Sequence, residues 1–263
     1  MTPSPAAVIP RLRMFAGPNG SGKSTLIRKL QSVVLRPDML GVYINPDNIE
    51  QELREEGSLD FARFRIPPAT ASGIIPFLAS SPFLQTRNLA GIAQKIKISN
   101  GRLLHPAEPP PNSYLASVIA DFIRITLLTQ RASFSFETVM SSPDKIALLT
   151  RARSLGYRVY LYYVATEDSA INISRVNNRM RLGGHPVPEG KIIARYQRSL
   201  GLLGQAIRQT DRAYIFDNSR DEQEHTWIAE VTDANKLEIK TDQIPAWFAH
   251  AVPDTSSSPQ APR

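Results

Sequence analysis

The chain has 263 residues, of which 42% are hydrophobic and 21% charged, as is typical of a globular protein with a sizeable core. It contains no cysteine, which excludes disulfides and thiolate metal sites, and no apolar run long enough to span a membrane. The formal net charge of +7 suits either a phosphorylated ligand or a nucleic acid. Because like charges form no long block, we favour a small-molecule ligand over a nucleic acid. The N-terminus does not resemble a signal peptide, so we expect a cytoplasmic protein.

Short apolar runs rich in β-branched and aromatic residues alternate with helical patterns along the chain. We expect strands at Arg11–Ala16, Gly41–Ile44, Ser133–Phe136, Arg158–Val164 and Ala213–Asp217. We expect helices at Lys23–Leu35, Asp47–Glu56, Ser113–Gln130, Pro143–Leu155, Asp168–Arg181 and Pro188–Gln209. This alternation predicts a three-layer α/β fold, in which a mostly parallel central sheet is covered by helices on both faces.

Three stretches depart from the alternation. The segment 57–112 is rich in Pro and Ser but also carries apolar clusters. We expect it to be an ordered insertion with short helices, since a structureless loop of that length is rare in a compact domain. The stretch Trp227–Thr241 predicts one or two added strands, and residues 253–263 predict a disordered tail. Residues 1–252 are therefore expected to form a single domain.

A phosphate-binding loop follows the first expected strand. Residues 17–24 match the pattern G-x-x-x-x-G-K-[ST] at every fixed position. A strand precedes the loop and a helix begins at its lysine, which is the context that lets backbone N–H groups surround a phosphate. The expected nucleotide contacts are Gly17, Pro18, Asn19, Gly20, Ser21, Gly22, Lys23, Ser24 and Thr25. In this interpretation Lys23 reaches the β- and γ-phosphates of ATP and the hydroxyl of Ser24 binds Mg²⁺.

The remaining motifs favour a P-loop kinase over other P-loop NTPases. The sequence has neither the N-K-x-D motif of guanine-specific proteins nor the apolar run followed by Asp-Glu of hydrolytic ATPases. The third strand is instead followed by a single carboxylate, Glu137, and then by Thr138. We therefore expect ATP and Mg²⁺ as the cofactors of a phosphoryl-transfer reaction.

Two carboxylates follow expected strands, where α/β sheets place their ligand-binding residues. Asp47 is a candidate general base, which would accept the proton of the attacking hydroxyl, although it could instead only cap the helix that follows. Glu137 is a candidate to bind a substrate hydroxyl or a metal-bound water. The alternative is that Glu137, like Asp47, has only a capping role.

The stretch from about residue 175 to 200 is rich in arginine and predicts a helical lid. Its arginines are Arg175, Arg179, Arg181, Arg195 and Arg198. A Gly-Gly-His-Pro sequence at 183–186 interrupts the helical pattern and would act as the hinge between two helices. Arginines on such a lid would neutralise the charge that develops on the transferred phosphoryl group.

Several of these motifs, in this order, resemble the zeta toxin family of P-loop kinases. They are AGPNGSGKST, NPDNI, FETVMSS, RVNNRMRLGGHPVPEGKIIARYQRSL and FDNS, and they span residues 13–219. The resemblance implies a kinase that phosphorylates UDP-N-acetylglucosamine or a related UDP-sugar on a sugar hydroxyl. It implies that Asp47 is the base and that Asp47, Glu137 and Thr138 bind the nucleotide-sugar.

The resemblance also implies catalytic arginines in the lid and a separate antitoxin chain as partner. We choose Arg179 and Arg195 as catalytic residues alongside Lys23 and Asp47, with Arg181 and His185 as rivals. The 57–112 segment is longer than in many zeta toxins, which leaves the identity of the acceptor open.

Two other classes of function stay open. The basic charge would suit a nucleic-acid-binding ATPase or a polynucleotide 5′-hydroxyl kinase, but no nucleic-acid-binding module is recognisable. A degenerate nucleotide-binding module is disfavoured, because Lys23, Ser24 and Asp47 are all present.

Overall fold

The computed structural model describes residues 9–33, 37–181, 187–220 and 224–252. The chain packs as two compact units. The first comprises residues 1–39 and 137–263, and the second comprises residues 40–136. The expectation of a single domain over residues 1–252 therefore stays a prediction.

The first unit is built on a mixed sheet whose strand order is β10-β9-β8-β7-β1. The three strands β1, β7 and β8 run parallel, whereas β9 and β10 are antiparallel additions. These strands are β1 (Arg11–Ala16), β7 (Arg158–Ala165), β8 (Arg212–Asp217), β9 (Thr226–Thr232) and β10 (Lys236–Ile239). β7 is buried at six of its eight positions, all except Arg158 and Tyr160, as expected for a strand with neighbours on both sides and side chains packed on both faces.

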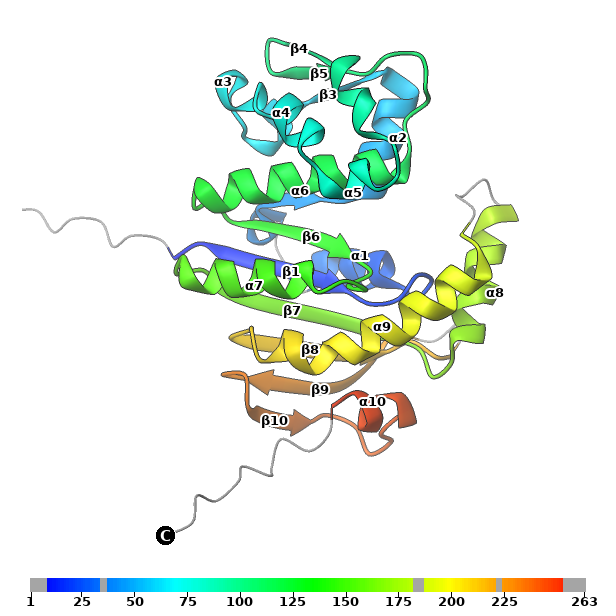
Figure 1. Cartoon of the computed structure of the whole chain (residues 1–263). Coiled ribbons are helices and arrows are strands. Elements are labelled where there is room, and N and C mark those ends of the chain that lie inside the picture. The colour runs from blue at the N-terminus through cyan, green and yellow to red at the C-terminus, as the bar shows by residue number, and fades with distance from the viewer. Residues whose placement is uncertain (1–8, 34–36, 182–186, 221–223, 253–263) are drawn as a thin grey trace, which may run out of the picture. The chain divides into compact units, whose positions relative to one another are not determined.

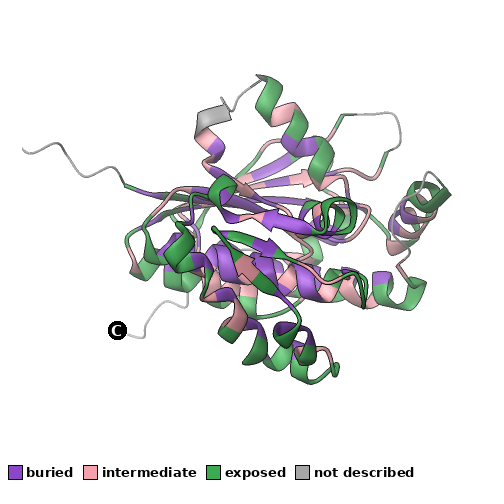
Figure 2. Ribbon diagram, turned by 90° about the horizontal axis from the view of Figure 1, so that it is seen from above, coloured by how far each residue is buried: buried purple, intermediate pink, exposed green. Residues whose placement is uncertain are grey.

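Helices lie on both faces of this sheet. Figure 1 shows α7 and α9 in front of the strands and α1 behind them. The helices of this unit are α1 (Lys23–Val33), α7 (Asp144–Ser154), α8 (Ser169–Arg181), α9 (Glu189–Ile207) and α10 (Ala246–Ala251). The central strands β1 and β7 are buried along most of their length, whereas the edge strand β10 is mostly exposed, and Figure 2 shows helices that are exposed on one side. This is the pattern of a core formed between a sheet and amphipathic helices.

The second unit contains a parallel strand pair, two long helices and a small separate sheet. β2 (Val42–Ile44) pairs with β6 (Phe134–Thr138), and α2 (Pro46–Glu56) packs on α6 (Ser113–Thr129). Between α2 and α6 the chain forms an antiparallel sheet of order β3-β5-β4 and several short helical segments. They are β3 (Ser58–Asp60), η2 (Phe61–Phe64), α3 (Pro68–Ala71), α4 (Ile74–Ala79), α5 (Pro82–Gln85), η3 (Ala90–Gln94), β4 (Lys97–Ser99) and β5 (Arg102–Leu104).

Local capping sets the ends of the two long helices in this unit. The side chain of Asn45 accepts a hydrogen bond from the N–H of Asp47, Pro46 occupies the first turn, and Gly57 ends α2 in the left-handed conformation. Asn112 caps α6 through hydrogen bonds from two backbone N–H groups. These two caps mark the two ends of the segment 57–112.

The expected α/β class and mostly parallel central strands are confirmed, with bounds of the alternating strands and helices that differ by at most two residues. The ordered segment between α2 and α6 has the short helices that the sequence predicts, and in addition a three-stranded sheet that it did not. The short helix α10 was also missed. The predicted disordered tail lies outside the described residues. None of the described helices is long and apolar enough to cross a membrane.

Candidate nucleotide-binding site

The loop after β1 has the backbone shape that its glycines permit. Gly17, Gly20 and Gly22 all have positive φ, at 143°, 74° and 93°. A Cβ on Gly17 would lie 2.0 Å from the carbonyl oxygen of Val164 on β7, so the first glycine allows the loop to leave the sheet beside its neighbour. As predicted, α1 begins at Lys23.

The lysine of the motif folds back over its own loop. The Nζ atom of Lys23 donates hydrogen bonds to the carbonyl oxygens of Gly17 and Pro18, at 2.8 and 2.9 Å. The ammonium group is thus held at the loop by weak neutral acceptors. An anionic ligand in the loop would offer a stronger, charge-assisted bond to the same group.

Three side chains from outside the loop hold its other carbonyl groups. Nδ2 of Asn172 on α8 donates to the carbonyl of Asn19 at 2.6 Å. Nδ2 of Asn218, which follows β8, donates to Ser21 at 2.8 Å. Nε2 of His225, just before β9, lies 3.1 Å from the carbonyl oxygen of Gly22, so that nitrogen carries the proton. The loop is therefore fixed by tertiary contacts as well as by its own glycines.

Ser24 and Glu137 meet beside the loop. The Oγ atom of Ser24 donates a hydrogen bond of 2.9 Å to Oε2 of Glu137, the next-to-last residue of β6. Glu137 is 7% exposed, whereas Ser24 is exposed. The contact brings together two oxygen-bearing side chains that the sequence separates by more than a hundred positions.

One turn of α9 contacts three loops at the carboxyl ends of the strands. NH1 of Arg195 lies 3.4 Å from Oδ1 of Asn19 in the phosphate-binding loop. The hydroxyl of Tyr196 donates to the carbonyl groups of Thr166 and Glu167 after β7, at 2.6 and 3.1 Å. Burial, with the nearby carboxylates, raises the pKa of Tyr196 to about 12, which keeps this donor protonated.

The next residues of the same turn reach the loop after β6. Nε of Arg198 donates to the carbonyl of Ser141 at 3.2 Å, and Oγ of Ser199 donates to that of Val139 at 2.8 Å. The phenol of Tyr163 in β7 lies 3.0 Å from the same Oγ, and burial raises the pKa of Tyr163. This part of α9 therefore packs against the loops that follow β6 and β7.

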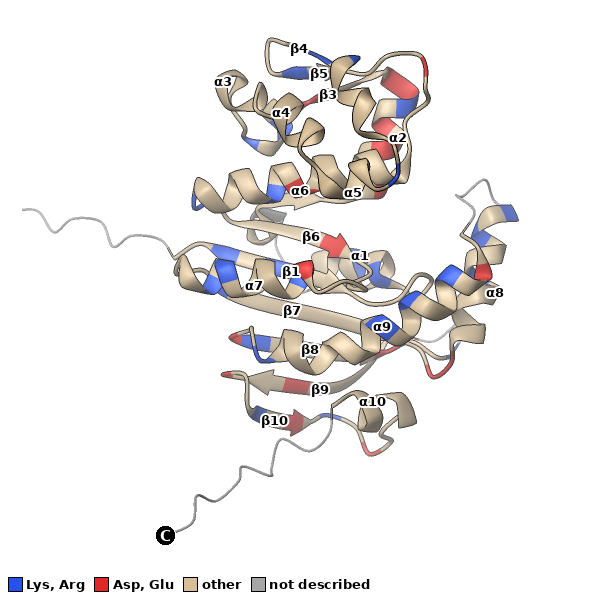
Figure 3. Cartoon of the chain, viewed as in Figure 1, with Lys and Arg blue, Asp and Glu red and all other residues tan. Residues whose placement is uncertain are grey.

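The arginines of α8 divide into two groups. NH1 of Arg175 donates to the carbonyl of Asn218 at 2.7 Å and so supports the residue that holds Ser21. Arg179 and Arg181 are exposed on the last turn, and within the described residues no hydrogen bond joins either to the phosphate-binding loop. Figure 3 shows basic residues spaced along both α8 and α9. His185, the other rival, lies outside the described residues.

The turn after β2 is organised locally. The exposed carboxylate of Asp47 lies in the first turn of α2, while the capping oxygen belongs to Asn45 and accepts the N–H of Asp47 at 2.9 Å. The alternative in which Asp47 is the cap of α2 is therefore wrong, because Asn45 already supplies the capping oxygen. The side chain of Asp47 has no such structural task.

Thr25 and Thr138 lie next to the main contacts of the site. Thr25 is exposed on α1, where its Oγ1 lies 3.4 Å from NH2 of Arg28. Oγ1 of Thr138 accepts the N–H of Met140 at 3.0 Å and so shapes the turn after β6. Sequence reasoning missed Asn172 and His225 as loop contacts, and only Asn218 stood within a quoted motif, FDNS.

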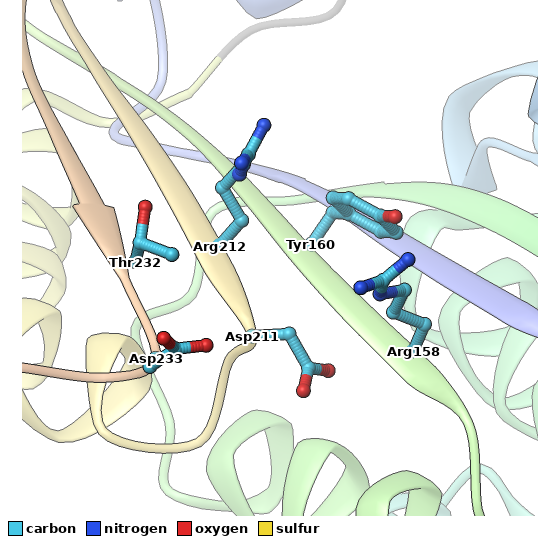
Figure 4. A pocket seen from close by; sticks show the side chains of 6 residues that line it. All are labelled: Arg158, Tyr160, Asp211, Arg212, Thr232 and Asp233. Carbon is cyan, nitrogen blue, oxygen red and sulfur yellow. The ribbon is translucent and has the colours of Figure 1, made fainter.

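A small cavity of about 170 Å³ lies at the other end of the first unit's sheet. Figure 4 shows its lining residues, Arg158, Tyr160, Asp211, Arg212, Thr232 and Asp233. Arg158 and Arg212 begin β7 and β8, whereas the phosphate-binding loop follows the carboxyl end of the parallel strand β1. The cavity is therefore separate from the predicted site and contains none of its residues.

Fold and loop together define an α/β protein with a P-loop. No protein-family model matches the sequence. Over 91 residues the chain is 30% identical to an uncharacterized protein of Haemophilus influenzae, a match that covers 33% of this chain and 65% of that protein. The chain thus spans slightly less than two-thirds of the curated relative.

Two solved structures have the same fold at low sequence identity. One is the crystal structure of AvrRxo1-ORF1:AvrRxo1-ORF2 with sulphate ions, which aligns at 13% identity and a TM-score of 0.53 over 97% of this chain and 67% of that one. The other is AvrRxo1-ORF1:-ORF2 with ATP, at 12% identity and a TM-score of 0.53 over the same shares of the two chains. At this identity the alignments establish the fold.

Proposed function

We propose that this protein is an ATP-dependent phosphotransferase that transfers the γ-phosphate of ATP to a hydroxyl group of a small molecule. The observation that carries the proposal is the meeting of Ser24 with Glu137 next to Lys23, at the end of a loop shaped by three positive-φ glycines. A loop of this kind presents backbone N–H groups to a phosphate, and Lys23 adds a positive charge. The similarity in fold to a structure solved with ATP supports the same ligand.

The residues present fit Mg²⁺ as well as ATP. The ion prefers oxygen ligands and usually keeps several waters, so that a hydroxyl and one carboxylate are sufficient protein groups. Ser24 would bind the ion directly, and Glu137 would hold either the ion or one of its waters. When bound, Mg²⁺ would neutralise charge on the phosphate oxygens. Glu137 therefore fits a role at the metal at least as well as the substrate-binding role that the family resemblance implies.

Asp47 is the proposed general base. Its carboxylate is exposed and is not needed to cap α2, since Asn45 has that task. A positioned carboxylate that takes the proton of an attacking hydroxyl accelerates transfer by about 10²–10⁴-fold. Arg195, which reaches the loop at Asn19, is the better supported of the two proposed catalytic arginines. Arg179 stays a proposal based on sequence.

For the acceptor we propose a nucleotide-sugar of the UDP-N-acetylglucosamine type, on the resemblance to the zeta toxin family. Asp47, Glu137 and Thr138 are the proposed acceptor contacts. A separate neutralising chain is also a proposal, supported by the fact that the two solved structures of similar fold are complexes of two proteins.

The direct test is phosphoryl transfer from radiolabelled ATP to a panel of UDP-sugars, with the products identified by mass spectrometry. We expect at least one UDP-sugar to gain a phosphate in the wild-type reaction, and none in the Lys23→Ala reaction. A label that appeared only on an oligonucleotide with a free 5′-hydroxyl would replace this function with polynucleotide kinase activity. ATP binding without transfer to any acceptor would contradict the enzymatic proposal.

A further inference from the structure

We propose that Asn172, Asn218 and His225 are positioning residues that set the affinity of the phosphate-binding loop for a nucleoside triphosphate. They would do so by fixing the direction of three backbone N–H groups. The inference rests on the proposed function, because it concerns the ATP-binding step of that reaction. None of the three residues belongs to the loop motif itself.

The argument starts from the geometry of the peptide bond. In a trans peptide the carbonyl of one residue and the N–H of the next point in opposite directions. A donor that holds the carbonyl of Asn19 from one side therefore turns the N–H of Gly20 to the other side. By the same rule, Asn218 on the carbonyl of Ser21 directs the N–H of Gly22.

His225 completes the set at the last peptide of the loop. Its Nε2–H donates to the carbonyl of Gly22, which also accepts the N–H of Leu26 at 3.0 Å, and the two donors together direct the N–H of Lys23. With Lys23 bonded to the carbonyls of Gly17 and Pro18, every carbonyl from Gly17 to Gly22 except that of Gly20 has a donor. Successive N–H groups turned to one side form an anion-binding concavity.

The holding side chains are themselves held in place. Asn172 is fully buried, and Oγ1 of Thr166 donates to its Oδ1 at 2.5 Å, which leaves Nδ2 to face the loop. The carbonyl of Asn218 accepts NH1 of Arg175 at 2.7 Å. Next to His225, Glu224 forms an ion pair with Lys29 of α1 at 2.5 Å. The side chain of Asn172 and the backbone of Asn218 are therefore held from other elements of the fold, and the residue before His225 is paired with α1.

The glycines of the loop pack directly on these residues. A Cβ on Gly20 would lie 2.8 Å from the carbonyl oxygen of Asn172, and one on Gly22 would lie 2.3 Å from Nδ2 of Asn218 and 3.0 Å from Nε2 of His225. The second and third glycines of the motif therefore make room for the groups that orient the loop. These two positions therefore require glycine for the contacts with the orienting side chains, in addition to the close approach of a phosphate.

The test measures ATP affinity in variants of the full chain that lose one donor each. Asn218→Ala removes the side-chain donor to Ser21, and His225→Leu removes the side-chain donor to Gly22, whose carbonyl keeps the N–H of Leu26. His225→Gln keeps an amide N–H that can reach the same carbonyl. One hydrogen bond contributes a net free energy that corresponds to about a two- to tenfold change in an equilibrium constant. We expect a rise of that size in Kd and KM for ATP in the first two variants, with kcat changed less, and recovery in His225→Gln.

Matched controls separate positioning from general destabilisation. Asn178→Ala alters an exposed residue of α8, and His250→Gln alters a histidine of α10 whose Nδ1 bonds only within its own helix. Both should leave the Kd for ATP unchanged. Thermal unfolding without ATP reports any loss of stability, and Asn218→Ala should retain folding because its side chain is only partly buried.

The possible outcomes separate the positioning role from the proposed function. If wild type binds ATP and the donor-deleting variants bind it equally well, the positioning role is wrong while the proposed function stands. If His225→Gln binds ATP as poorly as His225→Leu, the orienting donor is not the cause. If wild type itself does not bind ATP, the proposed function fails first.

Discussion

The two strand-to-helix connections that carry the proposed chemistry are built in different ways. After β1, the phosphate-binding loop is held by side chains from α8, from the residues after β8 and from those before β9. After β2, the turn is held by Asn45, two residues from the Asp47 N–H that it binds. The first connection depends on the tertiary structure, whereas the second is a local motif. We therefore expect that ATP binding at the first connection depends on residues from several elements. At the second connection, substitutions of Asp47 and Asn45 should affect phosphoryl transfer and stability separately.

The largest effect is expected at the first connection. Lys23→Ala removes the cation that bonds the carbonyls of Gly17 and Pro18 and would contact the triphosphate. We expect loss of measurable phosphoryl transfer and of tight ATP binding, with the fold retained by circular dichroism. Unchanged ATP affinity and turnover in a folded variant would contradict the assignment of the loop.

The second connection separates chemistry from stability. Asp47→Asn should lower phosphoryl transfer by at least about 10²-fold, since it removes a general base, while ATP binding is retained. Single-turnover assays at saturating ATP measure the transfer step. A variant that kept full transfer but unfolded more easily would show that Asp47 has a structural role instead.

The two candidate arginines differ in how they are held, and their variants should differ accordingly. Arg195 contacts Asn19 from a fixed turn of α9, whereas Arg179 is exposed on α8. Arg195→Ala should lower transfer by about 10²-fold, the usual cost of removing one group that stabilises developing charge. Comparison of kcat for Arg195→Ala and Arg179→Ala checks the difference, and an equal or larger loss in Arg179→Ala would reverse our order of the two.

Asn45→Ala is the stability counterpart of Asp47→Asn. It removes the capping oxygen of α2 and should cost about 1 kcal/mol of unfolding free energy, within the usual range of about 0.5–2 kcal/mol for a lost N-cap. Urea denaturation measures the change, and the ATP affinity of the folded variant should be unaltered. A loss of ATP affinity would show that the turn after β2 is coupled to the triphosphate.

The smallest effect concerns pH. Burial lowers the pKa of His225, with further lowering by the neighbouring charges of Lys29 and Arg175, partly opposed by the bond to Gly22 and by Glu224. The unfolded chain therefore binds a proton more readily, so stability contributed by the neutral ring should fall as pH drops below about 6.5. His225→Gln should flatten this part of the stability profile measured between about pH 5 and 7. His105, whose pKa burial also lowers, would leave a residual slope.

Much of the fold was predictable because its signals are local. The alternation of buried strands and amphipathic helices predicted the α/β class, and the glycine pattern of residues 17–22 predicted the loop between β1 and α1. The three-stranded sheet within residues 57–112 was not predicted. Its strands have three residues each, which is too short for an alternating pattern to be recognised.

The sequence by itself determined the loop, its lysine and serine, and the position of Asp47 just after a strand, because each is defined by residues that are close together in the sequence. Only the tertiary structure decided that Ser24 meets Glu137 and that Arg195 is the predicted arginine in contact with the loop. It also supplied Asn172, Asn218 and His225. Orienting a backbone carbonyl takes only one side-chain N–H group within hydrogen-bond distance of it. That group can belong to any element that the fold brings next to the loop, so no sequence pattern marks it.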